Sequence, residues 1–126
     1  MPAVRTGSEE GSSVVEFAIV IPLVFLMLVA SLELVTVTRV QLQVTHAARE
    51  GARQAATSPD PADAVQAVRS ALPSNLADRA RVSVQRPHVV GQQAKVGVRI
   101  AYRFASFAFG GLVLNVGADS VMRVER

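Results

Sequence analysis

The chain has 126 residues, 50% of them hydrophobic, a formal net charge of +3 and no cysteine. This length allows one small domain beside a membrane segment and leaves no room for a large enclosed active site. The absence of cysteine excludes disulfide bonds, thiolate metal sites and a cysteine nucleophile. Because the basic residues are spread from Arg5 to Arg126 without a dense cluster, the net positive charge does not indicate nucleic-acid binding.

An uncharged apolar run at residues 17–32 is bounded by Glu16 and Glu33. A helix needs about 20 mostly apolar residues to cross the hydrocarbon of a bilayer, and residues 14–35 reach that length when both glutamates lie near the interfaces. The rest of the chain is too short to enclose so long an apolar helix, so we predict a transmembrane helix. The alternative is a secretory signal cleaved near Ala30, but the run is longer than the apolar core of about 7 to 15 residues typical of such signals.

The charges beside this span bear on its orientation. Arg5 is the one basic residue before the span, whereas Arg39, Arg49 and Arg53 follow it. Taken alone, the positive-inside rule places the C-terminal part of the chain in the cytoplasm.

Helical periodicity continues beyond the span, with apolar or small residues at spacings of three and four: Leu34, Val37, Val44, Ala48, Gly51 and Ala55, interrupted by Gln41. A continuous helix over residues 12–57 would be roughly 70 Å long at 1.5 Å per residue, so more than half of it would project from the bilayer. The small residues Ala48, Gly51 and Ala55 allow another backbone to approach closely. Packing against the chain's own domain is the preferred explanation at each single position, because an amphipathic stripe usually covers its own core.

Turn residues at 57–59 predict the end of the long helix, and a second, short helix follows. Asp60, Pro61 and Asp63 match an N-cap, a first-turn proline and an acidic third residue. Calcium binding by the two aspartates is the alternative, but the run lacks the ligand density of a calcium loop. The apolar face of this helix consists of Ala62, Val65, Val68 and Leu72, and residues 73–75 end it.

Beyond the second helix the period changes to two, because Val82 and Val84 alternate with polar neighbours. A second strand has an apolar face and a basic face, made of Val96, Val98, Ile100, Tyr102 and Phe104 and of Lys95, Arg99 and Arg103. A turn at residues 90–93 joins the two strands. The predicted fold class is α+β, with a small antiparallel sheet of about three strands packed on the distal part of the long helix.

Two further segments complete the sheet region. Residues 117–126 form a weaker third strand, with Met122 and Val124 facing inward. The segment before it is too apolar for an ordinary loop, because it contains Phe107, Phe109, Leu112, Val113 and Leu114 around a turn at Gly110 and Gly111. Covering of the core is the preferred interpretation of this segment, and contact with the membrane or with a partner is the alternative.

The sequence contains no catalytic constellation. His46 and His88 lack an acidic or nucleophilic partner at a motif-like spacing, and there is no phosphate-binding glycine loop or metal-ligand spacing. His46 precedes Glu50 by four residues, which indicates an intrahelical pair rather than a metal site. We therefore expect no enzyme activity, no cofactor and no small-molecule substrate, and a role in anchoring or assembly.

The block GSSVVEFAIVIPLVF, which begins at Gly11, resembles the processing site and membrane helix of type IV pilin-like proteins. It looks like the TadE-like family of the tight-adherence pilus system in particular. The segment AAREGARQAA at residues 47–56 and the closing SVMRVER strengthen this resemblance. The middle of the chain carries almost no recognisable motif of the family.

The resemblance implies a bacterial pseudopilin of the inner membrane that assists the assembly of a pilus or secretion system. A prepilin peptidase would cut after Gly11, making Ser12 the first mature residue and Glu16 the fifth. The implied partners are the membrane, this peptidase and other pilus-assembly or pseudopilin subunits. The chain would then have four parts: a leader at residues 1–11, a transmembrane helix at 12–35, a stalk helix at 36–57 and an extracytoplasmic α+β domain at 58–126.

The position of Glu16 beside the apolar run also has an energetic consequence. A carboxylate at the membrane centre costs about 2.5–3.5 kcal/mol on insertion scales, so Glu16, near one end of the span, should seek the interface or a cation. The amine of Ser12 created by cleavage is a candidate cation, in the same chain or in a neighbouring subunit, and a solvated interfacial glutamate is the alternative. The second functional hypothesis is a membrane-tethered binding or envelope-anchoring protein whose leader is not processed.

Overall fold

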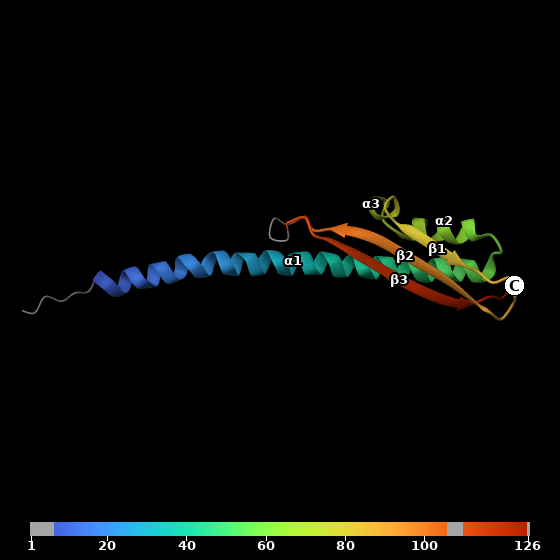
Figure 1. Cartoon of the computed structure of the whole chain (residues 1–126), viewed down its shortest axis with the longest axis horizontal. Coiled ribbons are helices and arrows are strands. Elements are labelled where there is room, and N and C mark those ends of the chain that lie inside the picture. Colours follow the sequence, from blue (N-terminus) through green and yellow to red (C-terminus); the bar gives the residue numbers. More distant parts are fainter. Residues whose placement is uncertain (1–6, 106–109, 126) are drawn as a thin grey trace, which may run out of the picture.

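The computed structural model of the chain describes residues 7–105 and 110–125. Figure 1 shows one long helix that carries all the other elements on its C-terminal half, so that its N-terminal half projects alone. The long helix, the short helices and a three-stranded antiparallel sheet confirm the predicted α+β class. In chain order the elements are α1 (Gly7–Thr57), α2 (Pro61–Ala71), α3 (Ser74–Ala77), β1 (Arg81–Gln85), β2 (Gln93–Arg103) and β3 (Val113–Arg123).

Helix α1 is a single helix of 51 residues, which corresponds to about 77 Å at 1.5 Å per residue. It begins at Gly7, earlier than the predicted start near Ser12, and it ends at Thr57 as predicted. Pro22 lies inside it without ending it. Several hydroxyl groups along the helix each donate a hydrogen bond to the backbone carbonyl four residues earlier, so these polar groups are paired within the helix itself. They are the hydroxyls of Ser31, Thr36, Thr38 and Thr45.

The C-terminal end of α1 is held by two donors from distant parts of the chain. Pro59 has no amide hydrogen, so the carbonyl of Ala55 lacks its usual partner four residues later. Arg86 Nε donates to that carbonyl at 2.7 Å, and the backbone N–H of Glu125 donates to the carbonyl of Ala56 at 3.1 Å. The loop after β1 and the C-terminal segment are therefore tied to the end of α1.

Helix α2 begins with the predicted cap. The Asp60 carboxylate accepts a hydrogen bond from the backbone N–H of Ala62 at 2.9 Å, and Pro61 occupies the first turn. The Asp63 carboxylate accepts a hydrogen bond from the Ser58 hydroxyl, so both acids take part in capping and turn contacts.

The face that α2 buries differs in part from the prediction, and Val65 is only half-buried. Ala64 and Val68 are fully buried and Leu72 is 6% exposed, whereas Ala62 lies on the surface. The prediction for Ala62 was wrong because the first turn of α2 faces solvent while its cap is formed. A short helix, α3, replaces the simple turn predicted at residues 73–75.

The strands form an antiparallel sheet in the order β1-β2-β3. The predicted apolar face of β2 is confirmed, since Val96, Val98 and Ile100 are buried and the basic residues of the other face are exposed. Gly91 has φ +89 in the connection before β2, within the predicted turn, and glycine is the residue that adopts this conformation without strain.

Strand β3 departs from the prediction in its start and in one inward residue. It begins at Val113 rather than near Gly117, so it takes in part of the segment predicted to be a covering loop. Val124 is 2% exposed, as predicted, but Met122 is 37% exposed. Met122 remains open because β3 is an edge strand without a neighbour on its outer side.

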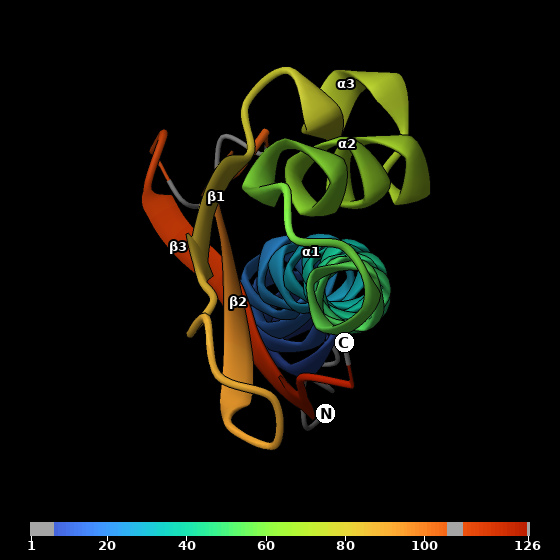
Figure 2. The ribbon, with the colours of Figure 1, turned by 90° about the vertical axis from the view of Figure 1, so that its right-hand side faces the viewer.

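The core lies between α1, the inner face of the sheet and α2. Figure 2 looks along the long axis and shows α1 enclosed by the sheet on one side and by α2 on another. The predicted stripe of α1 is largely correct, but Leu34 is 66% exposed because the domain covers α1 only further along, where Val40 is 7% exposed. The side chains that α1 contributes to the core are mostly small: Val40, Val44, Ala47, Ala48, Ala52 and Ala55.

Candidate functional site

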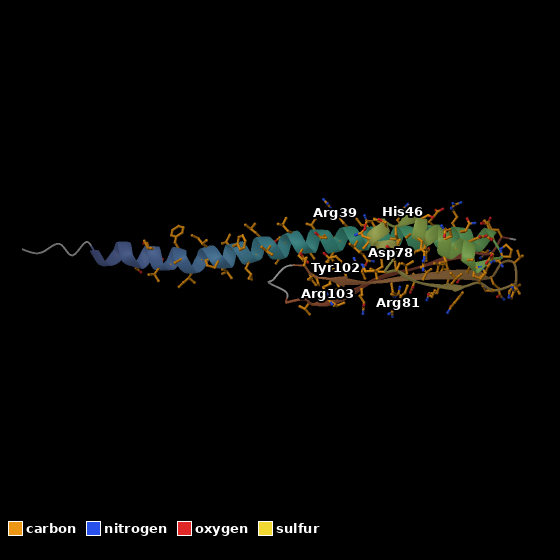
Figure 3. The ribbon with its side chains drawn as sticks, turned by 90° about the horizontal axis from the view of Figure 1, so that it is seen from above. Arg39, His46, Asp78, Arg81, Tyr102 and Arg103 are labelled. Carbon is orange, nitrogen blue, oxygen red and sulfur yellow. The ribbon has the colours of Figure 1, made fainter. Side chains whose placement is uncertain are left out.

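The N-terminal half of α1 is an apolar rod that no other described element covers (Figure 3). It is the one helix in the described ranges that is long and apolar enough to cross a membrane, and none of its most apolar window is buried. The core helix of a soluble protein would be mostly covered by other elements. This exposure is compatible with a single-pass membrane protein. The exposed side chains include Phe17, Ile19, Ile21, Leu23, Phe25, Met27 and Leu32.

Gly11, Ser12 and Glu16 lie together near the start of this rod, within the continuous helix α1. All three are exposed. Ser12 and Glu16 are four residues apart, so they lie on the same face of the helix one turn from each other. A positive charge at the nitrogen of Ser12 would therefore lie close to the Glu16 carboxylate.

Gly11 has no structural reason to be glycine in the folded chain. A Cβ added there would meet nothing within 4 Å, and its φ is not positive. Glycine inside a helix destabilises it by about 1 kcal/mol relative to alanine. Among the described residues, the fold therefore does not require glycine at this position.

Ala48, Gly51 and Ala55, the predicted small-residue stripe, are buried inside the chain's own domain. A Cβ added at Gly51 would lie 2.4 Å from Val68 Cγ2, on α2, and 3.1 Å from Val96 Cγ1, on β2. The close approach that these small residues allow is thus made by α2 and the sheet of the same chain.

The membrane-proximal end of the domain touches α1 at Glu33. The backbone N–H of Ala105, just after β2, donates to Glu33 Oε1 at 2.9 Å. Partial burial raises the pKa of Tyr102, and the negative charge of Glu33 raises it further. Tyr102 stacks edge to face with Phe104, with ring centroids 5.5 Å apart. A carboxylate, a phenol and a ring therefore meet where the apolar rod ends.

The exposed side of the stalk carries an ion pair other than the predicted one. Glu50 hydrogen-bonds and ion-pairs with Arg53, three residues later, and among the described residues it makes neither contact with His46. The hydrogen bond from Arg53 lowers the pKa of Glu50 against an opposing effect of burial, and the charges of Arg53 and His46 lower it further. The predicted His46 pair is replaced because the guanidinium of Arg53 offers two donors to the carboxylate.

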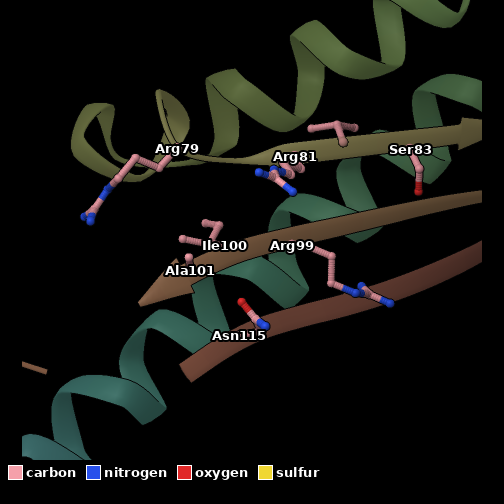
Figure 4. A pocket seen from close by; sticks show the side chains of 8 residues that line it. Arg79, Arg81, Ser83, Arg99, Ile100, Ala101 and Asn115 are labelled. Atoms are coloured by element: carbon pink, nitrogen blue, oxygen red, sulfur yellow. The ribbon is translucent and has the colours of Figure 1, made fainter. Parts of the chain in front are cut away.

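The outer face of the sheet holds a shallow depression of about 750 Å³, shown in Figure 4. Arg99 there ion-pairs with Asp119 at 3.0 Å, and Lys95 lies 3.6 Å from the same carboxylate. Arg81 lies directly opposite Arg99 in the sheet register. The lining residues are Arg79, Arg81, Val82, Ser83, Arg99, Ile100, Ala101 and Asn115.

The lining of this depression is basic. Its eight lining residues include the hydroxyl of Ser83 but neither an acid nor a histidine that could activate it. Across the described residues, no group of three or more His, Cys, Asp and Glu side chains is placed to hold a metal ion. What the arrangement offers chemically is positive charge for an acidic surface.

Two contacts near the membrane end of the domain were not foreseen from the sequence. Glu33 was expected only to lie near an interface, and Gln41 only to interrupt a stripe. Gln41 Nε2 donates to the carbonyl of Gly117 at 3.0 Å, and Glu33 accepts from Ala105. A polar residue inside an otherwise apolar stripe is the signal that could have pointed to such a link to the sheet.

The comparisons with known proteins agree with the geometry of α1. Residues 11–53 match the family model described as TadE-like protein. The matched range begins at Gly11 and includes the exposed apolar rod and most of the stalk. No curated protein and no solved structure matches the chain. The family resemblance predicted from the sequence is thereby confirmed over residues 11–53, where the chain is similar to the TadE-like family.

Proposed function

We propose that this chain is a pilin-like membrane subunit that assists the assembly of a tight-adherence pilus or a related secretion apparatus. The observation that carries the proposal is the TadE-like match over residues 11–53, which coincides with an uncovered apolar helix and its stalk. The TadE-like family is pilus-associated and structural, which supports this proposal.

The proposal includes removal of residues 1–11 by a prepilin peptidase. Gly11 supports it, because nothing in the fold requires glycine there and the junction with Ser12 lies on an exposed part of α1. The inserted subunit would lie in the inner membrane of a bacterium with the transmembrane helix at 12–35 and the domain at 58–126 outside the cytoplasm.

Glu16 would act in assembly through the charge created by cleavage. The mature amine of Ser12 would lie one helical turn from the Glu16 carboxylate, on a part of α1 that no described element covers. A carboxylate within an apolar span is stabilised by a cation, and a neighbouring subunit can supply the amine as well as the same chain. Other pseudopilin subunits are therefore the proposed partners of this end of α1.

The test is the mass of the protein recovered from membranes of cells with an active prepilin peptidase. The expected mass corresponds to a chain that begins at Ser12. Gly11→Leu should leave insertion intact and block cleavage, whereas the control Gly7→Leu changes a second glycine of the leader and should still be cleaved. Recovery of only the full-length chain from the unaltered gene would contradict the proposal.

The competing function is a membrane-tethered binding or envelope-anchoring protein without leader processing. The basic depression on the outer sheet face is the observation in its favour, because it offers positive charge away from α1. This function requires the uncleaved chain to be the active form, so the mass measurement separates the two.

A further inference from the structure

The β2–β3 hairpin runs back along α1 towards the apolar rod instead of away from it. Each strand has 11 residues, so the hairpin is about 36 Å long at 3.3 Å per residue. Figure 1 shows the end of β2 and the start of β3 beside the middle of α1, at the end of the domain nearest the N-terminal half. The hydrogen bond from Ala105 to Glu33 places the tip at the level of Glu33.

Glu33 also marks the expected surface of the bilayer. The rise along α1 from Glu16 to Glu33 is about 26 Å, close to the hydrocarbon thickness of about 30 Å. If the apolar residues between the two glutamates span the membrane, Glu33 lies at the second interface and the hairpin tip lies there with it. This step rests on the transmembrane placement of α1 in the proposed function.

The described side chains of the tip suit a membrane interface. Leu112, Val113 and Leu114 are 59%, 51% and 43% exposed, although they were expected to cover the core. That expectation does not hold for these three side chains, which stay exposed, and Phe107 and Phe109 of the same segment lie outside the described residues. Tyr102 stands on the same end of the sheet, and tyrosine is enriched at membrane–water interfaces.

We propose that the tip of the β2–β3 hairpin, Tyr102–Ala105 with Leu112–Leu114, is a second membrane contact that sits in the interface of the bilayer spanned by α1. Its apolar surface continues that of α1, where Leu32, Leu34 and Val35 are 70%, 66% and 51% exposed. Two contacts with one bilayer restrict the tilt of the stalk relative to the membrane.

Exposure alone does not distinguish this tip, because Val89 and Val90 at the opposite end of β2 are 57% and 62% exposed. The distinction is position: the length of β2 separates those valines from the level of Glu33. They are therefore matched controls, equally apolar and exposed but far from the expected bilayer surface.

The test uses the absence of cysteine, which lets one introduced cysteine carry a nitroxide label. The full-length variants Leu112→Cys, Leu26→Cys and Val89→Cys are placed in vesicles of phosphatidylethanolamine and phosphatidylglycerol. The collision rate of each label is measured with oxygen, which concentrates in lipid, and with a water-soluble nickel chelate. We expect the ratio of the oxygen collision rate to the nickel collision rate to be highest at position 26 and lowest at position 89. At position 112 the ratio should be severalfold higher than at position 89.

A second variant tests whether apolar character holds the tip in place. Leu114→Asp in the Leu112→Cys background should return the label to the nickel-accessible range, since a carboxylate is disfavoured in the membrane. Val90→Asp in the same background should leave the label unchanged.

Three results separate failure of this inference from failure of the proposed function. A nickel-accessible label at position 112 beside a lipid-exposed label at position 26 overturns the membrane contact alone. A label at 112 that neither reagent reaches shows burial by protein and also overturns it. A nickel-accessible label at position 26 means that α1 does not span the bilayer, and the proposed function fails with it.

Discussion

Gly51 is the residue at which the helix contacts of this domain are most sensitive to size. An added Cβ would lie 2.4 Å from Val68 Cγ2, and a β-branched valine cannot easily turn away. We predict that Gly51→Ala destabilises the domain, because overpacking typically costs about 1 to 3 kcal/mol and outweighs the helix-propensity gain of about 1 kcal/mol. The measurement is the urea dependence of trypsin resistance in membrane-embedded protein.

The double variant Gly51→Ala with Val68→Ala is the control for this prediction. Removing both Val68 methyl groups removes the clash, so the double variant should be less destabilised than the sum of the two single changes. Simple additivity would mean that the contact with Val68 does not decide the cost. Loss of partner recovery at unchanged domain stability would instead place Gly51 against another subunit.

The sequence could predict which residues of α1 are small but not what covers them. The spacing of Ala48, Gly51 and Ala55 is visible in the sequence. Packing of these residues within their own chain is the interpretation that the sequence favours over contact with another subunit. Whether α2 or a second chain approaches depends on how the connection after Thr57 folds back, which involves no periodic signal. The exposure of Leu34 could not be predicted for the same reason. The apolar stripe of α1 is buried only where the domain covers it, and the sequence does not show how far along α1 the domain extends.

Features that depend on neighbouring residues in the sequence could be predicted, whereas features that depend on contacts between distant segments could not. The end of α1 and the cap of α2 depend on Pro59, Asp60 and Pro61, which act over a few residues. The contact between Glu33 and Ala105 spans 72 residues and depends on the length of two strands. The early start of β3 at Val113 was also missed, because its apolar residues do not alternate with polar ones.

The next prediction concerns the stability of a whole element, the C-terminal end of α1. Arg86→Ala should destabilise the domain by about 1 to 3 kcal/mol, because it removes a charged donor from a carbonyl that Pro59 leaves without its helical partner. The control is Arg81→Ala, which removes an exposed arginine opposite Arg99 and should change stability by less than about 0.5 kcal/mol. Urea titrations of trypsin resistance measure both, and equal losses would show that Arg86 does not secure α1.

The whole molecule is a rod with a domain on one side, and the domain folds back towards the rod's apolar half (Figure 1). If α1 spans a bilayer as proposed, this arrangement places the end of β2 and the start of β3 close to that bilayer. A subunit of this shape would present neighbouring subunits with an apolar helix inside the membrane and a small α+β domain immediately outside it.

The orientation of this rod is the last prediction, and two physical signals oppose each other. Arg39, Arg49 and Arg53 follow the span and favour a cytoplasmic domain by the positive-inside rule, while the proposed function requires the domain outside. We predict the outside orientation, so alkaline phosphatase fused after Arg126 should be active and green fluorescent protein fused there should be dark. Replacing Glu9 and Glu10 by arginine adds positive charge before the span and should leave that pattern unchanged. An inactive phosphatase on the unaltered chain, with activity restored by those two arginines, would show that the flanking charges decide the topology and that the domain natively lies in the cytoplasm.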